Sequence, residues 1–319
     1  MSRGPRSRPA SPRVGIREVA AAAGVSTATV SYVLNDTPGQ TITEATRAKV
    51  RQTAAELGYI PHSVARTLRA GHSRIVLLNT GALLPGNSLE SLIAGMSEEL
   101  RRHDHVLLVT TESRGVDASV LASVSPRSVI DLTTVIMGTE ADDPISGVTQ
   151  GYHAGMAFHT RRQLQYLAER GHRRVAFALP DRAGDLGRTR LSHARQVARE
   201  SGITRLAELH VAPNPQDSQF SKRTIELVEN SDITAIAAFD DDTALTVLAG
   251  MRRAGYRAPR DLAVMGFDEG RHAALWDPPL TTVRINATAY GRRAARIALG
   301  LEAGQWTQPP SAVVVGQTV

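Results

Sequence analysis

Apolar residues recur at helical spacing in three short segments near the N-terminus. The pattern predicts helices over about 16–23, from Ser26 onward, and over 43–57. Gly24 interrupts the first helix, Ser26 is a good N-cap for the second, and Gly58 is a typical C-terminal stop for the third. The residues that we expect to face inward are Val19, Ala20, Ala23, Val30, Val33, Leu34, Val50, Ala54 and Leu57.

From residue 74 onward, short apolar runs alternate with segments of helical period. The predicted strands are 75–79, 106–110, either 129–132 or 134–137, 175–179, 209–212, 235–239, 262–267 and 312–315. The predicted helices are 89–102, 117–124, 161–170, 188–201, 218–230, 243–254 and 287–303. This alternation is typical of parallel sheets covered by helices, so the sequence predicts an α/β fold with two lobes. Ligands of such folds bind in a crevice at the carboxyl ends of the strands.

The chain divides into four predicted segments. Residues 1–13 are rich in Arg, Ser and Pro and have no apolar period, so we expect a disordered basic arm. The all-α unit then covers 14–60. Pro61 prevents simple continuation of its last helix, and a linker with a short amphipathic piece covers 61–72. The two-lobed domain covers 73–319.

The positive charge of the chain is concentrated in its first quarter. The formal net charge is +6, and residues 1–74 hold eleven basic against four acidic residues, while the rest holds 26 basic and 27 acidic residues. A concentrated basic region indicates a polyanion partner, because Lys and Arg release the counterions condensed on phosphates. A generic basic tail is the alternative.

The composition excludes several classes of chemistry. The chain has no cysteine, so disulfides, thiolate metal sites and cysteine nucleophiles are absent. It has no apolar run long enough to span a membrane and no apolar segment behind the basic N-terminus, so we expect a cytoplasmic protein. No G-x-G-x-x-G, P-loop or G-x-S-x-G motif occurs, and Asp240–Asp242 are consecutive residues that would not converge on one ion. We therefore expect no catalytic residues, no metal and no cofactor.

The first two predicted helices and the glycine turn between them form a helix-turn-helix pattern. This motif presents the first turn of its second helix, here Ser26-Thr27-Ala28-Thr29, to the major groove of DNA. The N-terminus of that helix also favours a phosphate group. From the periodicity alone, an ordinary three-helix cap on a larger domain is the alternative.

Two N-terminal stretches closely resemble the headpiece of the LacI/GalR family of bacterial transcriptional regulators. They are IREVAAAAGVSTATVSYVLN (16–35) and TRAKVRQTAAELGYIPHSVARTLRAG (46–71). Four later segments resemble landmarks of the family's effector domain, which is similar to sugar-binding periplasmic proteins. They are GHRRVAFA (171–178), FDDDTAL (239–245), APRDLAVMGFDE (258–269) and DPPLTTV (277–283). The resemblance thus spans almost the whole chain.

The resemblance implies DNA contacts from the second helix. Thr27 and Ala28 occupy the positions that read base edges in the family. The positions that hold phosphates are Ser26, Thr29 and Ser31. Tyr32 replaces the usual Arg, which pairs bidentately with guanine, so we expect a different operator half-site. Alternatively, Tyr32 lies over the sugar-phosphate backbone and reads no base.

The resemblance also implies a hinge helix over 63–70. Leu68 aligns with the leucine that wedges into the central minor-groove step, with Ala65 and Arg66 alongside. Because a helix of this length is not stable alone in water, we expect it to fold only when two hinges pair on DNA. His62 replaces the family's capping Asn. The alternative for Leu68 is burial against the core lobe.

In the effector domain, the family's ligand contacts map onto Arg190, Asp240 and Asp268. An Arg and two carboxylates can hydrogen-bond sugar hydroxyls or a small anion. Alternatively, Asp240 caps the helix that follows, Asp268 ends a strand and Arg190 is a solvated helix residue. Trp276 either stacks on a sugar face or packs in the core.

Three features depart from the family pattern. His193 stands where the family has Gly, Asp240 stands where it has Asn, and the stretch from about 133 to 160 is shorter by roughly one β–α unit. This stretch also lacks an expected Asp-containing segment, so the first lobe would supply fewer ligand contacts.

The sequence predicts a repressor that binds a pseudo-palindromic DNA operator as a homodimer in the cytoplasm, at the nucleoid. A small molecule, a sugar or related metabolite, would bind between the lobes and control it. One alternative is a regulator of this architecture that has lost its effector response. The other is a sugar-binding protein with no role on DNA.

Overall fold

The computed structural model describes residues 14–34, 37, 39–59, 73–81, 86–132, 155–212, 226, 232–304 and 311–319. The chain divides into two compact units, Met1–Ser73 and Arg74–Val319. Several predictions lie outside the described residues: the arm 1–13, the hinge with its capping position 62, the alternative strand 134–137, and the helix 218–230 apart from Glu226. The division of the first unit into arm, headpiece and hinge therefore stays a prediction.

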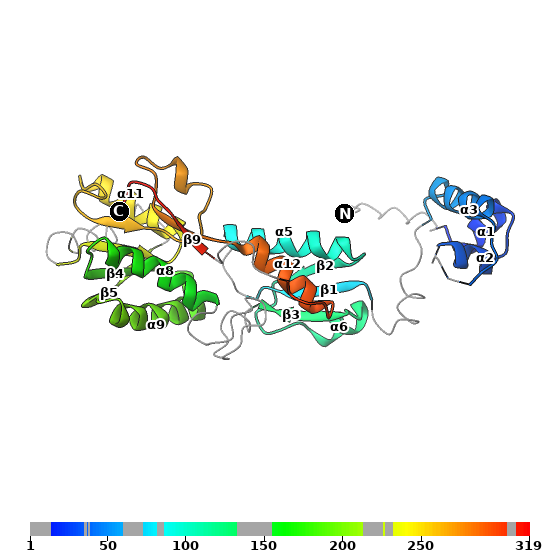
Figure 1. Cartoon of the computed structure of the whole chain (residues 1–319), viewed down its shortest axis with the longest axis horizontal. Coiled ribbons are helices and arrows are strands. Elements are labelled where there is room, and N and C mark those ends of the chain that lie inside the picture. Colours follow the sequence, from blue (N-terminus) through cyan, green and yellow to red (C-terminus); the bar gives the residue numbers. More distant parts are fainter. Residues whose placement is uncertain are drawn as a thin grey trace, which may run out of the picture. The chain divides into compact units, whose positions relative to one another are not determined.

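The first unit contains three helices packed around a small apolar core (Figure 1). They are α1 (Ile16–Ala23), α2 (Thr27–Leu34) and α3 (Glu44–Glu56). Gly24 ends α1 with a left-handed φ of 67°, which glycine adopts without steric cost. The buried side chains are Val19, Ala20, Ala23, Val30, Val33, Val50 and Ala54, as predicted. The prediction for Leu57 was wrong: α3 ends one residue earlier and Leu57 is 38% exposed.

The first lobe of the second unit is a parallel sheet with strand order β2-β1-β3. Its strands are β1 (Ile75–Asn79), β2 (Val106–Thr110) and β3 (Ser128–Asp131). Its helices are α5 (Asn87–Arg102), α6 (Ala118–Val124) and α12 (Ala287–Ala298). The apolar core includes side chains of β1, α5 and α12, and these two helices lie side by side (Figure 1). Because α12 comes from the last tenth of the chain, the C-terminal region helps to build the first lobe.

Helices α5 and α12 approach each other through two glycines. A Cβ atom at Gly95 of α5 would strike the backbone carbonyl of Thr288, and a Cβ atom at Gly291 of α12 would strike the carbonyl of Leu92. Neither glycine has a positive φ. The backbone contact between the helices, and not the backbone conformation, therefore requires glycine at these positions.

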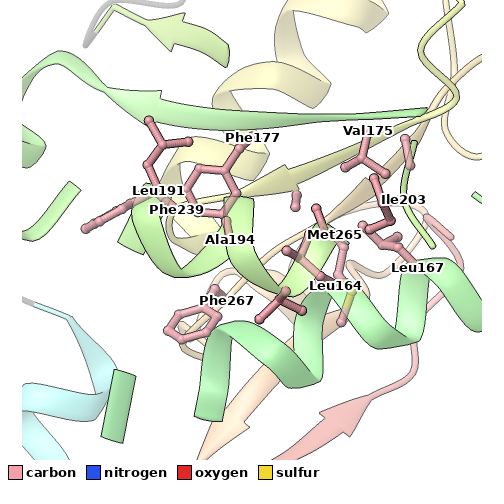
Figure 2. Close-up of a cluster of buried hydrophobic side chains, with 14 of the residues drawn as sticks. Leu164, Leu167, Val175, Phe177, Leu191, Ala194, Ile203, Phe239, Met265 and Phe267 are labelled. Carbon is pink, nitrogen blue, oxygen red and sulfur yellow. The ribbon is translucent and has the colours of Figure 1, made fainter. Parts of the chain in front are cut away.

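The second lobe is a four-stranded parallel sheet, with strand order β5-β4-β6-β7, between helices. Its strands are β4 (Arg174–Pro180), β5 (Arg205–Val211), β6 (Ala235–Ala238) and β7 (Ala263–Met265). Its helices are α8 (Gly155–Glu169), α9 (Gly184–Glu200) and α11 (Asp241–Arg253). Alternate strand residues enter two apolar clusters, one with α8 and α9 (Figure 2) and one with α11. Burial on both faces explains why these strands read as continuous apolar runs.

The predicted fold class, an all-α headpiece with a two-lobed α/β domain, is confirmed. Several boundaries were wrong: α8 and α9 begin earlier than predicted, and α12 ends at Ala298 because Gly300 takes a left-handed φ of 75°. The strand β8 (Thr282–Ile285) was not predicted. It pairs antiparallel with β9 (Ser311–Val314), so the strands are not all parallel. A strand of four residues such as β8, whose partner strand is distant in the sequence, shows too short a hydrophobic pattern to be recognised.

Candidate functional site

The first turn of α2 is open to solvent. Ser26, Thr27 and Ala28 are exposed, while the DNA candidates Thr29, Ser31 and Tyr32 are partly buried. The amide of Thr29 donates to the Ser26 hydroxyl at 3.0 Å, so Ser26 caps the helix as predicted. Behind this turn, Val30 and Val33 are completely buried. The apolar core thus fixes α2 and leaves its N-terminal turn accessible.

The N-terminus of α2 also suits an anion. Its first turn carries no acidic side chain, so a phosphate would meet no carboxylate of this helix there. The unpaired amides of a helix N-terminus carry partial positive charge and attract anions. The other DNA candidates, Ala65, Arg66 and Leu68, lie outside the described residues.

Arg190, the expected ligand contact on α9, is buried inside the second lobe. It is 1% exposed, so the alternative of a solvated helix residue is wrong. Its guanidinium lies 3.6 Å from the ring centre of Phe267 and donates to the carbonyl of Phe239, to Gln163 Oε1 at 3.1 Å and to Thr160 Oγ1 at 3.4 Å. Arg190 therefore connects α8, α9 and the end of β6.

Burial and nearby carboxylates have opposite effects on the pKa of Arg190. Burial lowers the pKa of its guanidinium to about 9, and the carboxylates of Asp240 and Asp268 oppose that shift. Arg190 is thus still cationic at neutral pH. The structure brings these three sequence candidates together within electrostatic range, near the carboxyl ends of β6 and β7, where α/β folds bind ligands.

Gln163, on α8, is a further residue of this site that the sequence analysis missed. It is completely buried. Its Nε2 donates to the carbonyls of Ala238 at 2.9 Å, Met265 at 3.3 Å and Gly266 at 3.0 Å. Because the amide nitrogen faces carbonyls, Oε1 is left to accept from Arg190. A polar residue four positions before the apolar Leu167, on one face of the helix, was the available signal.

Asp240 and Asp241 have separate structural tasks. Asp240 accepts from the Thr243 amide at 2.7 Å, so the alternative that it caps α11 is confirmed. Asp241 is buried and accepts from the amides of Phe267 at 2.8 Å and Gly270 at 2.5 Å. A third bond comes from the hydroxyl of Thr282 at 2.6 Å. Burial raises the pKa of Asp241 to about 7, although these three donors favour the ionised form.

Asp268 joins the two lobes. It follows β7 and takes a φ of 98°, a left-handed conformation that is rare for residues other than glycine. Its Oδ1 accepts from the Ser88 amide at 2.9 Å, and its carbonyl accepts from Asn87 Nδ2 at 3.1 Å. Burial raises the pKa of Asp268 to about 6, against the opposing effect of the hydrogen bond from the Ser88 amide.

Two histidines lie near Arg190. His159 is buried, and burial, with a smaller contribution from Arg190, lowers its pKa to about 3. Its ring meets the edges of Phe158 and Tyr290, and among the described residues its Nδ1 has no hydrogen-bond partner. Burial and Arg190 also lower the pKa of His193. The surroundings of Arg190 therefore disfavour additional positive charge.

Trp276, the last ligand candidate, follows the short helix η3 (Ala273–Leu275). Its side chain is partly buried and packs against the apolar cluster around α11, as the core-packing alternative predicts. Across the described part of the chain, no cluster of three His, Asp or Glu side chains could hold a metal ion. None of the helices described there has the length and apolarity to cross a bilayer.

Two family models match this chain. Residues 15–62 match the model of bacterial regulatory proteins of the lacI family, and residues 164–319 match that of the periplasmic binding protein-like domain. The transcriptional repressor PurR of Edwardsiella ictaluri is 27% identical, with 88% of this chain and 90% of the relative covered. The transcriptional regulator CelR of Thermobifida fusca is also 27% identical, with 93% and 94% covered.

Solved structures share the fold. The lac repressor dimer bound to operator and the anti-inducer ONPF matches with a TM-score of 0.71 and 21% identity, covering 96% of this chain and 99% of that one. The CelR–cellobiose complex matches with a TM-score of 0.56 and 23% identity, covering 96% and 100%. These likenesses concern the fold alone.

The headpiece, the two-lobed domain and the relatives together define a DNA-binding transcriptional regulator of the helix-turn-helix class with an effector-binding domain. The N-terminal domain of the chain is that of the LacI family of bacterial regulatory proteins, and its C-terminal half is similar to periplasmic binding proteins.

Proposed function

We propose that the protein is a homodimeric repressor that binds a pseudo-palindromic operator and responds to a small molecule bound between its lobes. One observation carries the DNA part: the first turn of α2 is exposed, free of acidic side chains and supported by a buried core. A dimer places two such helices in successive major grooves. Specific complexes of this kind have Kd values of roughly 10⁻⁸–10⁻¹¹ M near physiological salt.

Within each half-site, Thr27 and Ala28 contact base edges, and Tyr32 replaces the guanine-reading Arg of the family. The phosphate contacts come from Ser26, Thr29 and Ser31. The exposure of Ser26 and its position at the helix N-terminus support this assignment. In the hinge, Leu68 wedges into the central minor-groove step beside Ala65 and Arg66.

A matched pair of cap variants tests the phosphate contact. Ser26 caps α2 and Thr43 caps α3, each by accepting an amide from three residues ahead. Ser26→Ala and Thr43→Ala should each cost about 1 kcal/mol of stability, the usual value for a lost cap. We expect only Ser26→Ala to weaken DNA binding beyond that common loss, measured by fluorescence anisotropy with operator duplex. Equal affinities of the two variants would reject the contact.

The wedge is tested separately. Leu68→Ala should weaken specific binding far more than non-specific binding, because only the specific complex gains from the kinked centre. An equal loss on operator and on scrambled duplex would reject the role of Leu68.

The effector site consists of Arg190, Asp240, Asp268 and Trp276, with a sugar or related metabolite as the ligand. Two observations support it: Arg190, Asp240 and Asp268 lie within electrostatic range, and CelR, one of the fold neighbours, was solved with cellobiose. Ligand binding would change the relation of the lobes and so couple to DNA affinity, typically by 1–3 kcal/mol.

A regulator without effector response is the second candidate. It is favoured by the bonds that already occupy the expected ligand groups: Arg190 donates to Phe239 and Gln163, Asp240 caps α11, and Asp268 accepts from Ser88. Selection of bound sequences from random DNA, repeated with candidate sugars, separates the two. The second candidate would be supported if the protein selects one palindromic sequence, if no metabolite weakens its binding to that DNA, and if calorimetric titrations with the metabolites show no heat of binding. Recovery of no preferred sequence would overturn the DNA-binding proposal itself.

A further inference from the structure

Helix α5 of the first lobe has no N-terminal cap of its own. Its N-cap position is Gly86, which has no side chain to accept from the first amides of the helix. These amides need partners, because the first turn of a helix leaves them unpaired. The carboxylate of Asp268, 180 residues further along the chain and in the second lobe, accepts from the Ser88 amide at 2.9 Å. Asp268 thus caps α5 from the opposite lobe.

Gly86 has a specific reason to be glycine. A Cβ atom there would lie 2.5 Å from Asp268 Oδ2, closer than real Cβ atoms approach other atoms. The backbone of Gly86 is extended, with φ −174° and ψ 171°, and any residue can adopt that conformation. The close approach of Asp268 is therefore what requires the absence of a side chain.

The turn that carries Asp268 is strained and firmly held. Asp268 has φ 98° and Glu269 has φ 48°, and such conformations persist only where surrounding contacts enforce them. Asp241 stabilises these conformations, because its carboxylate accepts from the amides of Phe267 and Gly270, which flank Asp268 and Glu269. Arg284 of β8 also pairs with Glu269.

We propose that the turn 267–270 is a latch between the lobes, in which Asp268 caps α5, Asp241 positions the turn and Gly86 leaves room for the carboxylate. The neighbouring Arg271–Glu90 pair, at 3.9 Å between largely exposed side chains, adds little to the latch. The latch has a regulatory consequence, which rests on the effector site proposed above. A ligand that donates hydroxyl or ammonium hydrogens to Asp268 competes with α5 for this carboxylate and so releases the lobes.

Interlobe distances measured by pulsed electron-spin resonance test the latch. Because the chain has no cysteine, Ala122→Cys on α6 and Arg199→Cys on α9, both at exposed positions, direct the two spin labels without interference. Gly86→Ala should broaden the distance distribution or shift it to longer values. The control Glu90→Gln should leave the distribution unchanged, because it removes only the exposed Arg271–Glu90 pair at 3.9 Å.

A second variant keeps the test decisive if Gly86→Ala does not fold. Asp268→Gly tolerates the left-handed φ of 98° and removes the carboxylate that accepts from the Ser88 amide. It should broaden the distribution as well. Circular dichroism shows which variants fold. If a folded variant has the same interlobe distance distribution as the wild type, the latch proposal is wrong. The measurement uses neither DNA nor effector, so its failure is distinct from failure of the proposed function.

The pH dependence supplies a readout that a merely structural role would not give. Burial raises the pKa of Asp268 to about 6 in the latched structure, so the latched form binds a proton more readily than a released form with a solvated carboxyl group. The wild-type distribution should therefore narrow as the pH falls through 6. The charged and titratable groups around it are Arg190 on α9, Asp240 and Asp241 on α11, Glu269 with its partner Arg284 on β8, and the Glu90–Arg271 pair. Asp268→Gly should abolish the transition near pH 6. A transition that persists in this variant would assign it to another group and count against the latch.

Discussion

At the residue scale, the same side chains have partners that the sequence does not reveal. Arg190 was assigned by resemblance to a ligand, yet its guanidinium is enclosed by Phe177, Phe239 and Phe267 and bonds to Gln163. A buried cation without such partners would cost several kcal/mol. Arg190 therefore stabilises the second lobe whatever else it binds.

We predict that Arg190→Lys destabilises the protein by about 2–4 kcal/mol, through lost charge-assisted hydrogen bonds and lost stacking. Lysine cannot replace the fork of the guanidinium, and Gln163 Oε1 is left without its donor. Urea unfolding followed by circular dichroism measures the change. The control Arg188→Lys, at an exposed position two residues before Arg190 on α9, should stay within about 0.5 kcal/mol of wild type. A small effect of Arg190→Lys would mean that the buried contacts are dispensable.

His159 predicts a dependence of stability on pH. Its pKa falls from 6.5 to about 3 on folding, so between these values the unfolded chain binds a proton that the folded chain does not. Stability is therefore lost as the pH decreases below 6.5, by about 1.4 kcal/mol per pH unit. His159→Phe, which keeps an aromatic ring beside Tyr290, should reduce the loss between pH 6.5 and 5 by about 2 kcal/mol.

Asp241 and Asp268 act in the opposite direction, because their raised pKa values make the folded chain bind protons first. The comparison of His159→Phe with wild type removes these shared contributions. Urea unfolding at both pH values provides the free energies. If the two proteins have the same pH slope, the assignment of a neutral buried His159 is wrong.

At the element scale, close packing of helices depends on residues with no side chain. The Cβ that alanine would add at Gly291 of α12 meets the backbone of Leu92, and backbone cannot move aside as a flexible side chain can. The contact between α5 and α12 is thus set by a small number of glycines. It also links the C-terminal part of the chain to the first lobe.

We predict that Gly291→Ala destabilises the protein by about 1–3 kcal/mol, the usual cost of overpacking. In an isolated helix the same substitution is stabilising by up to about 1 kcal/mol, so the sign alone is informative. Gly95→Ala affects the same interface, and the double variant should cost less than the two single costs added together. Thermal or urea unfolding of the four proteins completes this cycle. A stabilising Gly291→Ala would contradict the packing.

At the scale of the whole molecule, charge is distributed unequally between the two units. The first unit carries the excess positive charge, whereas the second is nearly neutral and holds the buried charged groups around Arg190. Affinity for a polyanion should therefore depend on the first unit alone. Four of its arginines, Arg3, Arg6, Arg8 and Arg13, precede the described residues.

We predict that replacing these four arginines by glutamine reduces the salt dependence of DNA binding. Each phosphate contact contributes about −0.9 to the slope of log K against log salt, so the slope should become shallower by up to about 3 to 4. Anisotropy titrations at several salt concentrations give both slopes. The control Arg252→Gln with Arg253→Gln, exposed on α11 of the second unit, should leave the slope unchanged. An unchanged slope in the fourfold variant would show that the arm does not contact phosphates.

The sequence by itself determined the elements and their class. The helical period of apolar residues, with Gly24 and Ser26 at the helix ends, predicted α1 and α2, and continuous apolar runs predicted β4 and β6. Both signals are local properties of the chain, so they can be read from the sequence. Resemblance further brought Arg190, Asp240 and Asp268 forward as candidates. The unpredicted β8 and the glycine contacts of α5 with α12 had no comparable local signal.

The tertiary structure alone decided which polar groups meet. Asp241 receives donors from Phe267, Gly270 and Thr282, and Asp268 caps a helix that begins at Asn87 in the other lobe. Those partners lie 26 to 180 residues away along the chain. A hydrogen bond depends on distance in space, and burial makes the pairing obligatory, so neither can be read from the order of residues alone.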